Sequence, residues 1–468
     1  MAGATLTIGG AFNSQVGIVS VPSSFSGSIG GSLNQLLENY LVSLTGSITS
    51  TIPGGAYAFE NNDIVGGGDF VTGSGSGSFE EFTNTDASGN TTGGSANGAY
   101  IVSSGVTDVM VEAPGNTLLV ADPSVKFALF GAGSNVAYIQ SGGGSASIFA
   151  AGGTNTINDI AANVNDTVWS GGKDLVAFNG VSGNDVLNAD GDATTTVLIG
   201  GSDGATVTAS DHANVNVMFL EHAGGNLDFI NNSSQAQTVY SGAYADGGFA
   251  ANSVTVNAGA GGGYYVGGRA GANYLVGGTG AVTLIGGGVN DTLIGSASTG
   301  GSAGFNNFLV GGPGAETLIG ASGSGSNAFE IGVYSAGIGA YQASGLASTD
   351  GSGLQVFNIG GTNGETITGS NVNGASNIYQ VIDDQSVSIT GSSLVISNFS
   401  GNSTINLVDS TLTAPGASSI AYLGVDNRLG GTEIDLADGT QIILKGVSFS
   451  NVATTAGAHG VASIVFKP

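Results

Sequence analysis

A nine-residue spacing of leucines between glycine clusters is the feature that most restricts how this chain can fold. In the stretch YLVGGTGAVTLIGGGVNDTLIGS, Leu275, Leu284 and Leu293 stand nine residues apart, and each is followed by an apolar residue and then by glycine. A later stretch, FLVGGPGAETLIGA, repeats the step from Leu309 to Leu318. A short fixed period indicates a repeating architecture in which each unit stacks on its neighbours.

A similar spacing of apolar segments extends over most of the chain and predicts a series of short strands. Between residues 101 and 380, apolar pairs and triplets alternate with clusters of Gly, Asn, Ser and Asp at steps of roughly nine to ten residues. Within these runs the apolar residues alternate, as at Val109 and Val111 or at Ala128 and Phe130, which is the period of a β-strand. We therefore predict an all-β fold, a parallel β-solenoid of the β-roll or β-helix kind. Two steps would make one coil of about 18 residues.

The composition is consistent with an ordered structure that is rich in turns. Of 468 residues, 86 are glycine, 41% are hydrophobic and only 8% are charged, whereas disordered chains are poor in apolar residues. Asp and Glu number 33 against 6 Lys and Arg, giving a formal charge of -27. This balance argues against nucleic acid and anionic membranes as partners and suits cations. No apolar run reaches the length of about 18 residues that a membrane helix needs, so we expect no membrane insertion.

Three further regions flank or precede the solenoid. Residues 1–60 contain the one helix-like segment, at 31–46, which we expect either to cover the open end of the solenoid or to dock on another subunit. Residues 61–100 are rich in Gly and Ser and predict a loop or an irregular coil. Residues 381–468 carry longer alternating strands around an ADGT turn, which predicts a C-terminal β-domain that acts as a cap.

The repeats GGTGAVTLI, GGGVNDTLI and GGPGAETLI resemble the nonapeptide GGxGxDxUx of the repeats-in-toxin (RTX) family. The resemblance implies a parallel β-roll that holds Ca²⁺ between successive turns through the aspartate and turn carbonyls. In this chain the aspartate position is occupied by Val282, then Asp291, then Glu316. The repeat has thus kept the glycines and leucines of a stacked coil and lost most of the aspartates.

Calcium is the cofactor that the resemblance implies, and acidic residues in matching or near-matching repeats are its candidate ligands. They are Asp166, Asp174, Asp185, Asp291, Glu316 and Glu365. Each also has a simpler interpretation as a turn residue that hydrogen-bonds its own backbone. Asp291 lies in the best-preserved repeat and is the first place to look for an ion.

The stretch GTEIDLADGTQIILKGV near the C-terminus resembles the terminal domains of proteins exported by the type I secretion route. This resemblance implies an uncleaved C-terminal signal and a location outside the cell or on its surface. The start, MAGATLTIGG, lacks the basic and apolar regions of an N-terminal secretory signal. A plain hairpin is the alternative interpretation of the C-terminal stretch.

We expect no catalytic residues and no enzyme activity. A polysaccharide lyase or epimerase needs acidic residues beside Arg or Lys, whereas the basic residues here are scattered and the charge would repel an acidic polymer. The segment ASDHANVNVMFLEHAGG places Asp211 and His212 ten residues before Glu221 and His222, either as a metal site or as solvent-facing turn residues. Trp169 and the Tyr-rich repeats predict an aromatic ladder or, alternatively, a sugar-binding platform.

These features together predict a secreted structural protein. It would assemble with copies of itself into an extracellular fibre, a surface layer or a biofilm matrix, with calcium as a stabilising ion. The alternative is a secreted adhesin or carbohydrate-binding solenoid whose partner is a cell-surface polysaccharide.

Overall fold

The structure is a computed structural model of the chain. It forms two compact units, Met1–Gln235 (unit 1) and Ala236–Pro468 (unit 2). The structure describes residues 5–9, 16–20, 59–61, 67–71, 78–83, 98–102, 106–111, 116–121, 123–131, 133–139, 144–150, 152–159, 165–180, 183–202, 204–220, 223–241, 253–269, 271–297, 305–312, 314–323, 325–332, 343–360, 364–382, 393–408, 420–422, 430–436, 439–456 and 462–466.

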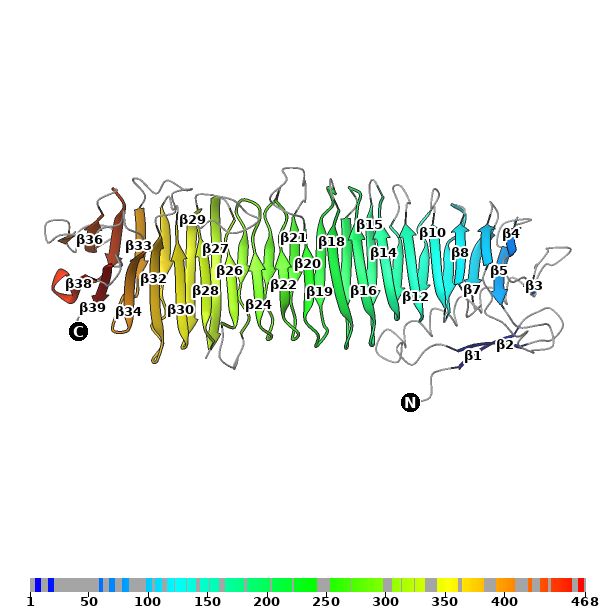
Figure 1. Cartoon of the computed structure of the whole chain (residues 1–468), viewed down its shortest axis with the longest axis horizontal. Helices are drawn as coiled ribbons and strands as arrows, with labels where there is room; N and C mark the ends of the chain where they lie inside the picture. The colour runs from blue at the N-terminus through cyan, green and yellow to red at the C-terminus, as the bar shows by residue number, and fades with distance from the viewer. Residues whose placement is uncertain are drawn as a thin grey trace. The chain divides into compact units, whose positions relative to one another are not determined.

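Unit 1 contains two sheets of short parallel strands, which the chain visits alternately (Figure 1). The even-numbered sheet consists of β4 (Gly67–Val71), β6 (Gly98–Val102), β8 (Asn116–Ala121), β10 (Ser134–Ile139), β12 (Thr154–Asp159), β14 (Lys173–Phe178), β16 (Thr194–Ile199) and β18 (Asn214–Phe219). The odd-numbered sheet consists of β3 (Phe59–Asn61), β5 (Ser78–Thr83), β7 (Val106–Val111), β9 (Phe127–Phe130), β11 (Ser147–Ala150), β13 (Thr167–Ser170), β15 (Asn184–Ala189), β17 (Gly204–Ala209) and β19 (Leu227–Asn231).

Each coil contributes one strand to each sheet, which is the arrangement of a parallel β-solenoid. Ser134 pairs with Thr154 and Thr154 pairs with Lys173, so these successive coils advance by 20 and 19 residues. This step slightly exceeds the 18 residues of two ideal nonapeptides, and the strands β10, β12 and β14 have six residues each. The prediction of an all-β parallel β-solenoid is confirmed.

The alternation of apolar and polar residues explains why these segments form strands with one face in the core. In β15 and β16, every second side chain is buried and the others are half-buried or exposed. Val176, Leu187, Val197 and Val207 face inward and are fully buried. Burial of one such side chain contributes about 1.5–3 kcal/mol, which offsets the entropy lost by the glycine-rich turns.

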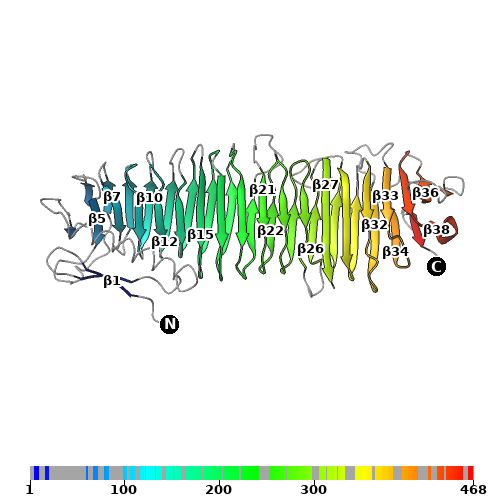
Figure 2. The ribbon, with the colours of Figure 1, turned by 180° about the vertical axis from the view of Figure 1, so that it is seen from behind.

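Unit 2 repeats this design and can be followed from behind in Figure 2. Its even-numbered sheet consists of β20 (Gln237–Tyr240), β22 (Gly263–Val266), β24 (Val282–Ile285), β26 (Asn307–Val310), β28 (Asn327–Ile331), β30 (Leu354–Ile359), β32 (Ser376–Ile382) and β34 (Ser403–Val408). The odd-numbered sheet consists of β21 (Val254–Asn257), β23 (Tyr274–Val276), β25 (Thr292–Ile294), β27 (Gly314–Gly323), β29 (Ala343–Gly351), β31 (Glu365–Thr368) and β33 (Ser393–Ser397).

The leucines that defined the nine-residue step lie in the core of unit 2. Leu275, Leu293 and Leu318 are partners across the odd-numbered sheet, while Leu284 and Leu309 are partners across the even-numbered sheet. All five are at most 1% exposed. One nonapeptide therefore corresponds to half a coil, and successive repeats alternate between the two sheets.

Aromatic side chains stack along both units. In unit 2, the rings of Phe329 and Phe357 are stacked with centroids 4.6 Å apart, and Tyr379 stacks on Phe357 at 5.1 Å. In unit 1, Trp169 stacks on Phe149 at 4.3 Å. Of the residues that predicted an aromatic ladder, Trp169 takes part in a stack, whereas the stack in unit 2 uses other residues, all of them buried.

Near the C-terminus, the strands continue the two sheets of unit 2 but reverse direction. β37 (Gln441–Lys445) pairs in parallel with β33, whereas β36 (Gly431–Asp435) pairs with β37 and β35 (Ile420–Tyr422) pairs with β36 in antiparallel fashion. In the even-numbered sheet, β39 (Ala462–Phe466) is antiparallel to both β34 and β38 (Val452–Ala456). The strands that flank the predicted ADGT turn, β36 and β37, form an antiparallel pair. A 3-10 helix at Phe449–Asn451 is the sole helical element of the described residues.

Several expectations concern the N-terminal region. The predicted helix at 31–46 lies outside the described residues. In residues 1–60, β1 (Thr5–Gly9) and β2 (Val16–Ser20) form an antiparallel pair. Residues 61–100, expected as a loop or irregular coil, include β4 and β5, which belong to the two sheets of unit 1. Within the described part of the chain, no helix has the length and apolar character needed to span a membrane.

Candidate functional site

Two columns of polar side chains face the interior of each unit, one at the start of each kind of strand. We call the first inward position of the even-numbered strands the amide column. In unit 1 its members are Asn135, Asn155, Asp174 and Thr195, which are paired in register. We call the first inward position of the odd-numbered strands the carboxylate column. Its acidic members in unit 1 are Asp166, which directly precedes β13, and Asp185 on β15. All of these residues are buried.

The amide column of unit 1 is a continuous hydrogen-bonded ladder. Nδ2 of Asn135 donates to Oδ1 of Asn155 at 2.8 Å, and Nδ2 of Asn155 donates to Oδ1 of Asp174 at 2.8 Å. Oδ2 of Asp174 accepts a hydrogen bond of 2.5 Å from Oγ of Ser170. Burial raises the pKa of Asp174, and these hydrogen bonds oppose the rise. Asp174, a predicted calcium ligand, is thus the acceptor end of a ladder of side chains.

Unit 2 has the same ladder with amides at four successive coils, Asn307, Asn327, Gln355 and Asn377. Nδ2 of Asn307 donates to Oδ1 of Asn327 at 2.7 Å, and Nδ2 of Asn327 donates to Oε1 of Gln355 at 2.6 Å. An amide has both donors and an acceptor, so one amide can donate to the next along the stack, as Asn307 and Asn327 do here. The sequence analysis missed this column because each Asn follows a glycine cluster and was interpreted as part of a turn.

Two members of the carboxylate column of unit 1 form an acidic cluster with Asp159, which lies at the end of β12. Asp159, Asp166 and Asp185 are all buried, and each offers an oxygen that lies within 4.8 Å of the oxygens of the other two. Oδ1 of Asp166 accepts a hydrogen bond from the N–H of Ala146, and Oδ1 of Asp185 accepts one from the N–H of Asp166 at 2.9 Å. The main chain thus holds both carboxylates in the corner of the coil.

The structure brings together two predicted ligands, Asp166 and Asp185, and adds Asp159, which the sequence analysis did not single out. Asp159 is the last residue of β12, at a position where the neighbouring strands place Ile139 and Phe178. The sequence does contain a sign of this site. In a strand of alternating apolar and polar residues, Asp159 stands where an apolar residue is expected. Three buried carboxylates this close repel one another, and a bound cation would compensate the repulsion. Ca²⁺ takes six to eight oxygen ligands, so the cluster fits that ion as a partial ligand set.

In unit 2 the carboxylate column contains the other predicted ligands. Its members, from consecutive coils, are Asn273, Asp291, Glu316, Gly345 and Glu365. The carboxylate oxygens of Asp291 receive their hydrogen bonds from groups of the protein itself. Its Oδ1 accepts hydrogen bonds from the N–H and Nδ2 of Asn273 at 2.8 and 2.7 Å, and its Oδ2 accepts from the N–H groups of Gly287 and Gly288 at 2.8 and 3.1 Å. Burial raises the pKa of Asp291, and these four hydrogen bonds oppose the rise.

Glu316 is in the opposite situation. It is 3% exposed, and neither carboxylate oxygen has a hydrogen-bond partner. Burial raises the pKa of Glu316 to about 9, and the nearby charge of Asp291 adds to the rise. Glycine at position 311 makes room for this side chain, because a Cβ there would lie 2.8 Å from Oε2 of Glu316. At neutral pH the Glu316 side chain is therefore a neutral acid.

Glu365 shows a weaker form of the same effect. It is 1% exposed, its Oε2 has no hydrogen-bond partner, and burial raises its pKa to about 7. Gly345 lies between Glu316 and Glu365 in the column, with a φ of +146° that favours glycine. The predicted ligands of unit 2 thus differ among themselves: Asp291 is held by N–H groups, whereas Glu316 and Glu365 are short of donors.

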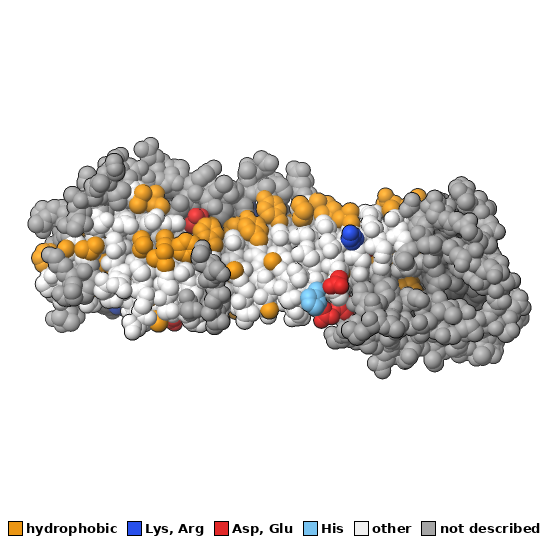
Figure 3. Space-filling model, turned by 60° about the horizontal axis from the view of Figure 1, so that its bottom comes forward, with side chains coloured by type: hydrophobic (Ala, Val, Ile, Leu, Met, Phe, Trp, Pro, Cys, Tyr) orange, Lys and Arg blue, Asp and Glu red, His pale blue; other side chains and the backbone are white. Residues whose placement is uncertain are grey.

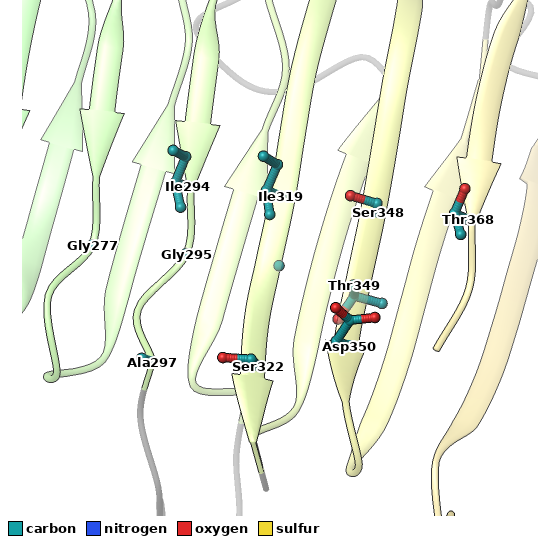
Figure 4. Close-up of a pocket in the computed structure, with 11 residues that line it drawn as sticks. Gly277, Ile294, Gly295, Ala297, Ile319, Ser322, Ser348, Thr349, Asp350 and Thr368 are labelled. Carbon is teal, nitrogen blue, oxygen red and sulfur yellow. The ribbon is translucent and has the colours of Figure 1, made fainter. Parts of the chain in front are cut away.

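An open groove of about 360 Å³ lies on the outer side of the odd-numbered sheet of unit 2. Figure 4 shows Ile294, Ile319, Ser348 and Thr368 in a row across successive strands of the odd-numbered sheet. Asp350 lies further along β29 than Ser348. Asp350 is the one ionisable side chain among the lining residues, so the groove does not offer an acid and a base together.

No protein family, no curated protein and no solved structure matches the chain. The functional argument therefore rests on the two columns and on the surface of each unit.

Proposed function

We propose that the protein is a secreted structural scaffold that assembles with copies of itself into an extracellular fibre, a surface layer or a biofilm matrix. The observation that carries this proposal is the in-register parallel stacking of coils within each unit, reinforced by interior ladders such as Asn307–Asn327–Gln355. In such stacking the main-chain hydrogen bonds between strands run along the stack and join each coil to the next. A repeating body of this kind suits a mechanical role better than catalysis.

Assembly would use the ends of the stack, where strand edges expose unpaired main-chain groups. Residues 1–60 would cover one such edge or dock on a second copy, and the antiparallel strands β36–β39 would act as the C-terminal cap. Negative-stain microscopy of the purified chain at high concentration, with and without CaCl₂, tests this directly. Fibres or sheets are expected, and particles that stay monomeric under both conditions would contradict the proposal.

We further propose that calcium stabilises the solenoid at the cluster of Asp159, Asp166 and Asp185. Calorimetry on EDTA-treated protein should show Ca²⁺ binding and a higher melting temperature with Ca²⁺ than without it. At a calcium concentration 100 times the dissociation constant, the gain would be about 2.7 kcal/mol. Asp185→Asn should abolish this gain, whereas the exposed Asp350→Asn should keep it. Equal calcium responses of the wild type and Asp185→Asn would exclude the cluster.

Export by the type I route is the proposed path out of the cell, and RTX-like repeats are the proposed origin of the coil. The antiparallel pair of β36 and β37 supports the proposed export route, because both strands belong to the stretch GTEIDLADGTQIILKGV that resembles type I-secreted proteins. Deleting residues 381–468 should leave the chain inside cells that express a type I exporter. Grafting the same residues onto a reporter protein should lead to its secretion.

The alternative is an adhesin that binds a cell-surface polysaccharide. The observation in its favour is a pair of exposed tyrosines, Tyr264 on β22 and Tyr274 on β23, which are 40% and 49% exposed. Exposed aromatic rings offer stacking surfaces for sugars. A glycan array should then show binding by the wild type that is lost in Tyr264→Ala and Tyr274→Ala. Binding to no glycan would remove this alternative.

A further inference from the structure

Two successive turns on unit 1 place acidic residues and a histidine side by side, outside both interior columns. The first turn, Asp190–Gly191–Asp192–Ala193, follows β15, and the second, residues 210–213, follows β17 one coil later. Each turn is closed by the same hydrogen bond, from the N–H of its fourth residue to the carbonyl of its first. Because Ala189 pairs with Ala209 and Thr194 with Asn214, the two turns lie one on the other in register.

The stacking brings particular side chains together. Asp192 is in register with His212, and Gly191 is in register with Asp211, whose N-terminal neighbour is Ser210. A hydrogen bond of 3.1 Å from the N–H of His212 to the carbonyl of Gly191 ties the turns to each other. Asp192, Asp211 and His212 are exposed. In Figure 3, the described histidine lies against a group of acidic side chains.

Asp190 is the unusual member of this group. It is 1% exposed, and neither of its carboxylate oxygens receives a hydrogen bond. The charge of Asp211 acts on Asp190, so the two carboxylates lie close to each other. A buried carboxylate that faces another carboxylate and lacks side-chain donors needs a positive charge to remain ionised.

We propose that Asp190 and Asp211 together bind a divalent metal ion, and that the exposed side chains of His212 and Asp192 turn toward the ion when it binds. Carboxylates combined with an imidazole favour a borderline ion such as Zn²⁺ or Mn²⁺ over Ca²⁺, which prefers oxygen ligands alone. This site is separate from the proposed calcium cluster and does not depend on the proposed function. The bound ion would join two neighbouring coils at their surface.

The two turns supply variants that preserve the fold. Asp211 has a φ of +52°, and Gly191, its equivalent one coil earlier, has a φ of +62°. Asp211→Gly therefore removes the carboxylate and places in the turn the residue that its equivalent position already uses. Asp190→Asn keeps the shape of the buried side chain and removes its charge. Asp228→Asn, an exposed position on β19 of the same unit, is the matched control.

The test is calorimetry with ZnCl₂ and with MnCl₂ on the EDTA-treated full chain, together with thermal melting. The wild type and Asp228→Asn should bind with the same affinity, and Asp190→Asn and Asp211→Gly should bind at least tenfold more weakly. His212→Asn should weaken Zn²⁺ binding by a similar factor. In EDTA, Asp190→Asn should melt above the wild type, because an uncompensated charge has been removed. Wild-type affinity in both Asp190→Asn and Asp211→Gly, or no binding of either metal by the wild type, would overturn the proposal.

Discussion

The amide column and the carboxylate column occupy equivalent places at the starts of the two strands of a coil. They differ in how their buried polar side chains obtain hydrogen-bond partners. Each column buries polar side chains from several coils at the same position of the strand. Asn327 both donates to Gln355 and accepts from Asn307, so its place in the column is self-sufficient. Glu316, in the other column, can only accept when it is ionised, and its two oxygens have no partner.

The difference shows what repetition does to a buried polar group. A solenoid presents the same position at every coil, so a side chain that complements itself is stabilised by each copy. A side chain that repels itself needs a different solution at each coil. The structure shows these solutions: main-chain N–H groups at Asp291, a bound proton at Glu316, and carboxylates gathered at Asp166 and Asp185.

The largest expected effect is the pH dependence caused by Glu316. Its pKa is raised from 4.5 to about 9 in the folded chain, so its contribution to stability is complete below pH 4.5 and is lost as the pH rises through 9. The free energy of unfolding should fall by about 6 kcal/mol over this range in EDTA. Urea titrations at several pH values should show the fall in the wild type, and Glu316→Gln should flatten it. An equal pH profile in the variant would contradict the assignment.

Glu365 should give the next largest effect, over a narrower range. Burial raises its pKa from 4.5 to about 7, so the loss of stability should occur between these values. Its size should be about 3 kcal/mol, and Glu365→Gln should remove it while leaving the fall above pH 7 that belongs to Glu316. If Glu365→Gln also flattens the profile above pH 7, the two glutamates titrate as one group and the separate assignment is wrong.

Breaking the amide column should have a smaller effect that does not depend on pH. Asn327→Ala removes an acceptor from Asn307 and a donor from Gln355, and leaving buried amide groups unpaired should cost about 2 kcal/mol. The exposed Asn257→Ala should change stability by less than about 0.5 kcal/mol. Urea unfolding at pH 5 and pH 8 measures both, and a cost for Asn327→Ala that changes with pH would contradict the explanation.

Much of this architecture could be predicted from the sequence because a solenoid is governed by local periodicity. The nine-residue step placed Leu275, Leu293 and Leu318 in one core row, and the nonapeptide aspartate position led to Asp291 and Glu316 in the carboxylate column. These features depend on glycine turns and on alternation, which are visible within a few residues.

The remaining features depend on contacts between coils. Asp159 meets Asp166 and Asp185 only because the strands come into register across coils of about 20 residues, and no local pattern records that distance. Asp174 has the same local sequence context as the other predicted aspartates, but it lies in the amide column. The reason is that it stands on an even-numbered strand, β14, where it pairs with Asn155. The ladder of amides was missed for the same reason, since an isolated Asn beside glycine is typical of a turn.

The central claim, that side-chain chemistry and not position separates the two columns, is tested most directly by exchanging that chemistry. Asn327→Asp introduces a carboxylate into the amide column, and Glu316→Gln introduces an amide into the carboxylate column. The free energy of unfolding should be measured for both variants and the wild type from pH 4 to pH 9 in EDTA. We expect Asn327→Asp to lose stability more steeply than the wild type as the pH rises, and Glu316→Gln to lose less. Profiles parallel to that of the wild type in both variants would contradict the account.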